Sequence, residues 1–151
     1  MMIKICTDIE QSKKLIELGL DKNTSDMCTS LITINGETKS QVLTVSYKEV
    51  NKYSAPDFIE RIPTWSLATL MNLLPSEFTE KGEYSETTYK IDIRKYALTD
   101  DVDIYQIAYG NYHWFKDGSN TWSDMVNTGE KEDLLDAVFQ MICWLKENNK
   151  I

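Results

Sequence analysis

Residues 89–94 read YKIDIR, and this short stretch decides the fold class. Its apolar residues alternate with charged ones, which is typical of a strand with one buried and one solvated face. Residues 102–109 are expected to be its antiparallel neighbour, with Gly110 marking a bulge or bend. Residues 112–115 and 121–126 predict a further hairpin around Asp117-Gly118. The second half is therefore expected to be mostly antiparallel sheet.

The first half contains another hairpin. Residues 29–34 are rich in β-branched side chains and are followed by Asn35-Gly36, which suits a type I′ turn because both residues tolerate positive φ. Residues 41–45 read as the second strand. Because residues 37–40 are poor strand material, the connection could be longer than two residues, and the register of this hairpin stays open.

Two amphipathic helices are expected near the chain ends. Thr7 and Glu10 have the spacing of a capping box, which predicts a helix over residues 8–18. Thr128 is the expected cap of the last helix, in which residues 134–145 supply a broad apolar face. These patterns place one helix before the first predicted strand and one after the last.

A third helix is expected over residues 65–74, between Thr64 as N-cap and Pro75 as stop. Its few polar residues form one narrow strip, so we expect the central buried helix; an element of a partner-binding groove is the alternative. Residues 48–63 are expected to be an irregular connection, and residues 76–86 a polar loop.

The expected order is thus α-β-β-α-β-β-β-β-α. It contains no alternating βαβ pattern, so an α+β fold, mostly antiparallel sheet with about three helices, is favoured over a parallel doubly wound one. A chain of 151 residues fits a single domain, residues 1–151.

Charge is unevenly placed along the chain. The formal net charge is −8; residues 1–75 hold 8 basic and 9 acidic side chains, and residues 76–151 hold 8 and 15. This disfavours direct binding of nucleic acid or anionic lipid, which needs clustered Lys or Arg. Besides solubility, mimicry of nucleic-acid charge by one continuous acidic band is the alternative interpretation of the excess.

Location and redox state follow from what the sequence lacks. No signal peptide or bilayer-spanning stretch is recognised, and the three cysteines form neither a disulfide framework nor a zinc motif. We therefore expect a cytoplasmic protein that does not associate with membranes.

Catalytic signatures are also missing from the sequence. GxxxxGK[ST], GxGxxG, GxSxG and HExxH do not occur, and His113 is the only histidine. Cys6 is expected to be a buried structural thiol, and the carboxylates of Asp100, Asp101 and Asp103 a solvated turn. We accordingly expect no catalytic, cofactor-binding or metal-binding residues; an enzyme is the alternative.

Aromatic residues are concentrated in the predicted strands of the second half. Since alternation prevents all of them from entering one core, some must face outward, where Tyr and Trp favour partner contacts. Cross-strand aromatic pairs covered by helices are the alternative. The candidate recognition surface consists of Tyr105, Tyr109, Tyr112, His113, Trp114 and Trp122.

Three helix-forming segments carry a resemblance: residues 5–15, residues 62–67 followed by 73–75, and residues 135–145. Together they resemble small proteins of gut bacteria and their phages or other mobile elements. The resemblance implies a cytoplasmic protein, and it brings no functional residues with it.

Three hypotheses follow. The leading one is a non-enzymatic protein-interaction module whose partner is another protein. The alternatives are a small-ligand binder or enzyme with a pocket near the aromatic strands, and a homo-oligomeric structural protein. The oligomeric state is left open.

Overall fold

The structure, a computed structural model, describes residues 3–151. The chain divides into two compact units, Met1–Asn72 and Leu73–Ile151. Both combine helices with an antiparallel sheet, which confirms the α+β class. Whether residues 1–151 fold as a single domain stays a prediction. Within the described residues, no helix is long and apolar enough to cross a membrane.

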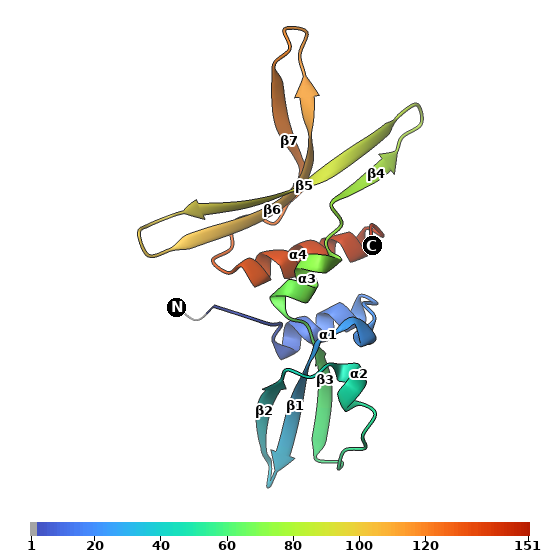
Figure 1. Cartoon of the computed structure of the whole chain (residues 1–151), viewed down its shortest axis with the longest axis vertical. Coiled ribbons are helices and arrows are strands. Elements are labelled where there is room, and N and C mark those ends of the chain that lie inside the picture. Colours follow the sequence, from blue (N-terminus) through green and yellow to red (C-terminus); the bar gives the residue numbers. More distant parts are fainter. Residues whose placement is uncertain (1–2) are drawn as a thin grey trace. The chain divides into compact units, whose positions relative to one another are not determined.

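The first unit holds a three-stranded sheet of order β2-β1-β3 (Figure 1). Its strands are β1 (Met27–Ile34), β2 (Glu37–Leu43) and β3 (Ile59–Thr64). Ile34 pairs with Glu37, so Asn35 and Gly36 alone make the turn, with φ values of 53° and 77°. The type I′ turn is confirmed, and the longer connection is excluded.

The connection between β2 and β3 is more regular than expected. It contains the short helix α2 (Tyr47–Val50), capped by the Ser46 hydroxyl, and then β3, which pairs with β1. Pro63 has no backbone N–H, but β3 is an edge strand, where a missing donor is tolerated. The expectation of an irregular segment over residues 48–63 is therefore wrong for residues 48–50 and 59–63.

Helix α1 (Ile9–Glu17) begins one residue later than expected. Its N-cap is Asp8, whose carboxylate accepts from the Gln11 N–H at 2.8 Å while the Gln11 side chain accepts from the Asp8 N–H at 3.1 Å. The hydroxyl of Thr7 lies 2.7 Å from that of Ser12 and accepts from the Trp65 N–H at 3.1 Å. Thr7 was the wrong cap because tertiary contacts occupy its side chain. A 3₁₀ turn (Lys22–Thr24) follows.

Helix α3 (Leu67–Leu73) is shorter than expected, and Thr64 is not its cap. Thr64 ends β3, where its hydroxyl is 2.7 Å from that of Thr29, and the Ser66 hydroxyl accepts from the Thr69 N–H at 3.2 Å. Only Leu70 is buried within the helix. The expectation of a helix buried around most of its circumference is therefore wrong.

The second unit holds a four-stranded sheet of order β4-β5-β6-β7. The strands are β4 (Glu77–Lys81), β5 (Glu86–Ala97), β6 (Asp103–Trp114) and β7 (Asn120–Asn127). β4 lies in the stretch expected to be a polar loop, which corrects that prediction. The register shifts between Tyr109 and Gly110, which confirms the bulge predicted at Gly110.

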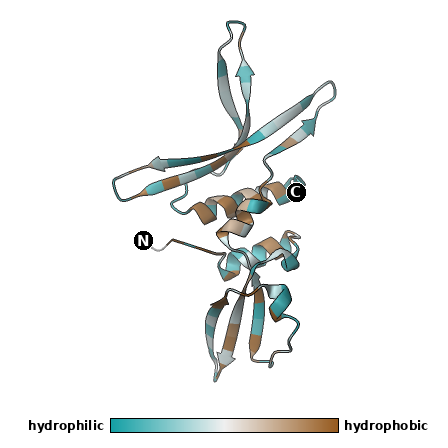
Figure 2. Ribbon diagram, in the orientation of Figure 1, coloured by the Kyte–Doolittle hydropathy of each residue, from teal (hydrophilic) through white to brown (hydrophobic). Residues whose placement is uncertain are grey.

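Helix α4 (Leu134–Glu147) packs against this sheet and carries much of the unit's apolar surface (Figure 2). The ring of Phe78 in β4 is 6.1 Å from that of Trp144 in α4. The N-cap is Asp133, whose carboxylate accepts from the Leu135 N–H at 2.9 Å. The expected cap, Thr128, instead accepts the Ile107 N–H of β6 at 3.0 Å, because it lies beside that strand.

Candidate functional site

The sheet of the second unit divides into two arms. β5 and β6 pair from Ala97 with Asp103 as far as Lys90 with Gly110. Beyond that pair, β5 continues with β4, and β6 continues with β7. We call residues 77–89 the β4–β5 arm, residues 111–123 the β6–β7 arm, and the space between them the fork. Figure 1 shows the two hairpins leaving their common strands in different directions.

The two faces of β6 have different surroundings. Phe78 faces its register partner Tyr89, and its ring lies 5.0 Å from that of Tyr109 and 6.1 Å from that of Trp144. Tyr109 therefore lies on the face covered by α4. Because side chains alternate along a strand, Tyr112 points to the opposite face.

The predicted aromatic cluster is split by this alternation. Tyr109 is fully buried, and its hydroxyl donates to the Pro75 carbonyl at 2.6 Å; burial raises the pKa of the Tyr109 phenol. Tyr105 is half-buried, and its backbone bonds to that of Lys131. Neither residue is on the β6–β7 arm, so Tyr109 belongs to the core and not to an exposed recognition surface.

The other four predicted residues lie together on the β6–β7 arm. Tyr112 and Trp122 are register partners whose rings meet edge to face, 5.1 Å apart at an angle of 78°. Trp114 is 71% exposed and Tyr112 55%, and alternation places both rings on the same face of β6; Phe115, the next residue after β6, is also exposed. His113 is exposed too, but alternation places it on the other face of the strand.

A shallow hollow of about 350 Å³ lies in the fork on the His113 side. It is open to solvent, and polar and apolar surface contribute about equally to its lining. Residues from both arms line it: Thr87, Tyr89, Asn111, His113, Ser123, Asp124 and Met125. This is the concave feature near His113 that a small-ligand site would need.

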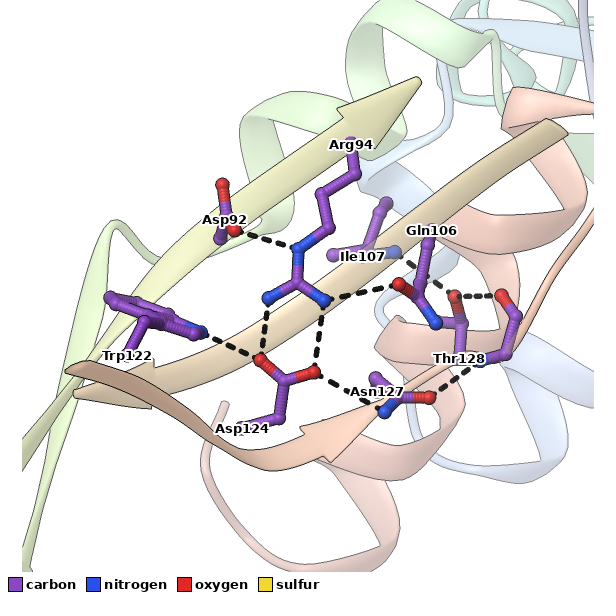
Figure 3. Close-up of polar contacts among 9 residues, drawn as sticks. Asp92, Arg94, Gln106, Ile107, Trp122, Asp124, Asn127 and Thr128 are labelled. Atoms are coloured by element: carbon purple, nitrogen blue, oxygen red, sulfur yellow. Dashed lines mark hydrogen bonds and ion pairs between the residues drawn. The ribbon is translucent and has the colours of Figure 1, made fainter. Parts of the chain in front are cut away.

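An ion-pair network that sequence reasoning missed joins the strands where the arms diverge (Figure 3). Arg94 of β5 reaches across β6 to Asp124 of β7, with Nη1–Oδ2 and Nη2–Oδ1 distances of 2.9 and 2.5 Å. Its Nε donates to Asp92 at 2.7 Å, and Nη1 also donates to Gln106 at 3.1 Å. The guanidinium is thus held by three side chains on one face of the sheet.

The same network holds the ring of Trp122 in place. Trp122 lies on the face of the β6–β7 arm that also carries Tyr112 and Trp114, and we call these three residues the aromatic face. Trp122 donates its indole N–H to Asp124 Oδ1 at 2.6 Å, and Asn127 donates to the other carboxylate oxygen at 3.4 Å. Hydrogen bonds from Arg94 hold the pKa of the Asp124 carboxyl below its usual range, and the contact with Asp124 raises the pKa of Arg94. The pair is therefore ionised at neutral pH, and it fixes the ring against which Tyr112 packs.

One sequence signal could have indicated this network. Asp92 and Arg94 are two residues apart on a predicted strand, as are Trp122 and Asp124, so each pair shares a face. Their meeting depends on the register across β6, which alternation alone does not determine.

Cys6, which was expected to be a buried structural thiol, is only partly buried. Burial raises the pKa of the Cys6 thiol, helped by Asp26 and Asp8, which opposes thiolate formation. Asp103 pairs with Lys95 at 3.1 Å, while Asp100 and Asp101 lie in the exposed β5–β6 turn. In residues 3–151, no group of three or more His, Cys, Asp or Glu side chains could hold a metal ion.

The acidic side chains of the second unit come from several elements of the chain. They are divided among the β4–β5 arm, the β5–β6 turn, the β6–β7 turn and the segment before α4. Asp92 and Asp124 are also neutralised by Arg94. Mimicry of nucleic-acid charge, which needs one continuous acidic band, stays a hypothesis.

No protein-family model, curated protein or solved structure matches the chain. What the molecule does is therefore inferred from the β6–β7 arm and the fork, where exposed aromatic side chains, open strand edges and a hollow occur together.

Proposed function

We propose that the chain is a non-enzymatic protein-interaction module that binds a partner protein through the aromatic face of the β6–β7 arm. The observation that carries the proposal is the exposure of two large rings on one face of a short hairpin: Tyr112 at 55% and Trp114 at 71%. Tyr and Trp are enriched at protein interfaces, and binding energy concentrates on such residues.

The anchoring of the arm supports this reading. Trp122 is held by Asp124, Asp124 by Arg94, and the ring of Tyr112 packs against Trp122. Rings that are ordered before binding lose less conformational entropy when a partner covers them. Binding would then bury aromatic surface at low entropic cost.

A two-ring variant tests the proposal. The immobilised protein is incubated with lysate from its native host. The amount of captured partner is then compared among the wild type, Tyr112→Ala/Trp114→Ala and the control Tyr84→Ala. Tyr84 is 92% exposed at the tip of the β4–β5 arm, so the Tyr84→Ala substitution removes an exposed ring from the other arm. We expect the double variant to lose at least about tenfold in partner affinity and Tyr84→Ala to keep it. Unchanged capture by the double variant rejects the proposal.

A small-ligand site in the fork is the second candidate, and the hollow favours it. Its volume of about 350 Å³ is near the lower end of ligand pockets, and hydroxyl, amide and imidazole groups line it. A small-molecule screen by ligand-observed NMR tests this reading with His113→Ala/Asn111→Ala as the variant. Ligands lost in this variant but retained by Tyr112→Ala/Trp114→Ala would favour the small-ligand site over the aromatic face.

A further inference from the structure

We infer that the partner segment is an extended, basic polypeptide that adds as a strand to the open edge of β6 in the fork. This inference rests on the proposed function and names the kind of partner that the β6–β7 arm takes. It follows from the direction of backbone groups, the end of the strand pairing and the charge of the unit.

The direction of the backbone groups in β6 is known from two hydrogen bonds. The N–H of Tyr105 donates to Lys131 O at 2.6 Å, and that of Phe115 donates to Ser119 O at 2.8 Å. Both bonds are on the β7 side of β6. Since backbone groups alternate sides along a strand, the N–H and C=O of Tyr112 and Trp114 point to the β5 side, into the fork.

The direction of the backbone groups in β5 is also known from a hydrogen bond. The N–H of Ile91 donates to Ser76 O at 3.0 Å, on the β4 side. Alternation then directs the backbone groups of Thr88 toward β6. Two strand edges therefore border the fork, and each has the donors and acceptors of an unfinished ladder.

No strand satisfies these groups within residues 3–151. The β5–β6 ladder ends at Lys90 and Gly110, so the backbone N–H and C=O of Tyr112 and Trp114, which point into the fork, have no ladder partner on β5. Unpaired strand edges are templates for a further strand, and main-chain hydrogen bonds then supply affinity.

Both faces of an added strand would meet suitable side chains. On one face, its residues would lie beside the exposed rings of Tyr112 and Trp114. On the other, they would enter the hollow lined by Tyr89, Asn111 and His113. The aromatic face and the hollow thus become two sides of one peptide-binding edge.

Charge selects the kind of strand. Residues 73–151 hold 15 acidic and 8 basic side chains, a net charge of −7, and Glu83 is exposed at the tip of the β4–β5 arm. A second copy of the chain would bring the same excess and be repelled, whereas a segment with Lys or Arg is attracted. A basic partner strand is therefore favoured over self-association at this edge.

A synthetic probe tests the inference on the full chain. The probe is a blocked peptide of alternating Lys and Val; one control has Glu in place of Lys, and the other is methylated on its main-chain nitrogens. Amide hydrogen exchange is followed by NMR. We expect the Lys–Val probe to slow exchange of the Tyr112 and Trp114 amides at least about tenfold, and both controls to leave it unchanged. The Trp122 amide, whose N–H points to the outer edge of β7, should not change.

Three outcomes overturn strand addition: no effect at millimolar probe, protection confined to the outer edge of β7 or to β2, and equal binding of the methylated peptide. In each case the Tyr112→Ala/Trp114→Ala result with the native partner is read separately. If that variant still loses the partner, the aromatic face is retained as the interaction surface and only the added strand is rejected. If it keeps the partner, the proposed function fails as well.

Discussion

Arg94 and Asp124 are 30 positions apart in the chain and form a two-point ion pair across the intervening strand β6, with N–O distances of 2.9 and 2.5 Å. The pair joins the outer strand β7 to β5 where the two arms diverge (Figure 3). The side chains of Arg94 and Asp124 are 18% and 22% exposed, so solvent screens their interaction only in part. This contact connects the stability of the sheet to the position of Trp122.

Replacing Asp124 should weaken the unit. In Asp124→Asn the Arg94 guanidinium loses the charge of one of its two carboxylate partners and keeps Asp92, and we expect the free energy of unfolding to fall by about 1–3 kcal/mol. Urea titration measures this change. The control Asp100→Asn removes an exposed carboxylate from the β5–β6 turn and should stay within about 0.5 kcal/mol of the wild type. Equal effects of the two substitutions would show that the ion pair contributes nothing.

The pH dependence of stability should also show the contribution of the Arg94–Asp124 ion pair. The pKa of Asp124 is lowered in the folded protein, so its stabilising contribution is present above the unfolded-state value of about 3.9 and is lost as pH falls through the lower folded value. The free energy of unfolding of the wild type should therefore decrease more steeply below pH ~4 than that of Asp124→Asn. Parallel curves for the two proteins would contradict the assignment.

The bulge at Gly110 should tolerate no side chain. A Cβ there would lie 2.2 Å from the Ser123 carbonyl oxygen, which is backbone and cannot move aside without shifting β7. We expect Gly110→Ala to cost about 1–3 kcal/mol of stability. In the matched control Gly82→Ala, the Cβ would be 3.1 Å from Ser85 O in an exposed turn, and the cost should be smaller. A larger loss in Gly82→Ala would refute this account of the bulge.

Two tyrosines three positions apart should behave differently. Tyr109→Phe removes the hydroxyl that donates to Pro75 O, and should lower the free energy of unfolding by about 0.5–1.5 kcal/mol without affecting partner capture. Tyr112→Ala should instead weaken partner capture, because its ring is exposed next to Trp122. Thermal denaturation and partner capture are measured on both variants. Loss of capture in Tyr109→Phe would contradict the assignment of Tyr109 to the core and of Tyr112 to the interaction surface.

Local patterns were sufficient for part of the fold. Alternation in residues 89–94 predicted β5, Asn35-Gly36 predicted the tight turn, and Gly110 predicted the bulge. These features depend on neighbours in the sequence, through side-chain alternation and backbone freedom at glycine.

The errors arose where distant contacts outweighed local preference. Thr7 has the sequence of a cap, but its hydroxyl is used by Ser12 and by Trp65, 58 residues away. β4 has polar strand residues and exists because β5 pairs with it. Sequence alternation did not separate the buried Tyr109 from the exposed Tyr112 and Trp114, since the position of α4 decides which face is covered.

Hydrogen exchange on the complex with the captured partner tests the central claim most directly. Exchange is compared between the free and the bound chain for every segment of residues 3–151. If the β6–β7 arm is the interaction surface, protection will be concentrated in residues 111–123, with the amides of Tyr112 and Trp114 among the most affected. Protection confined to the first unit, with residues 111–123 unchanged, would contradict it.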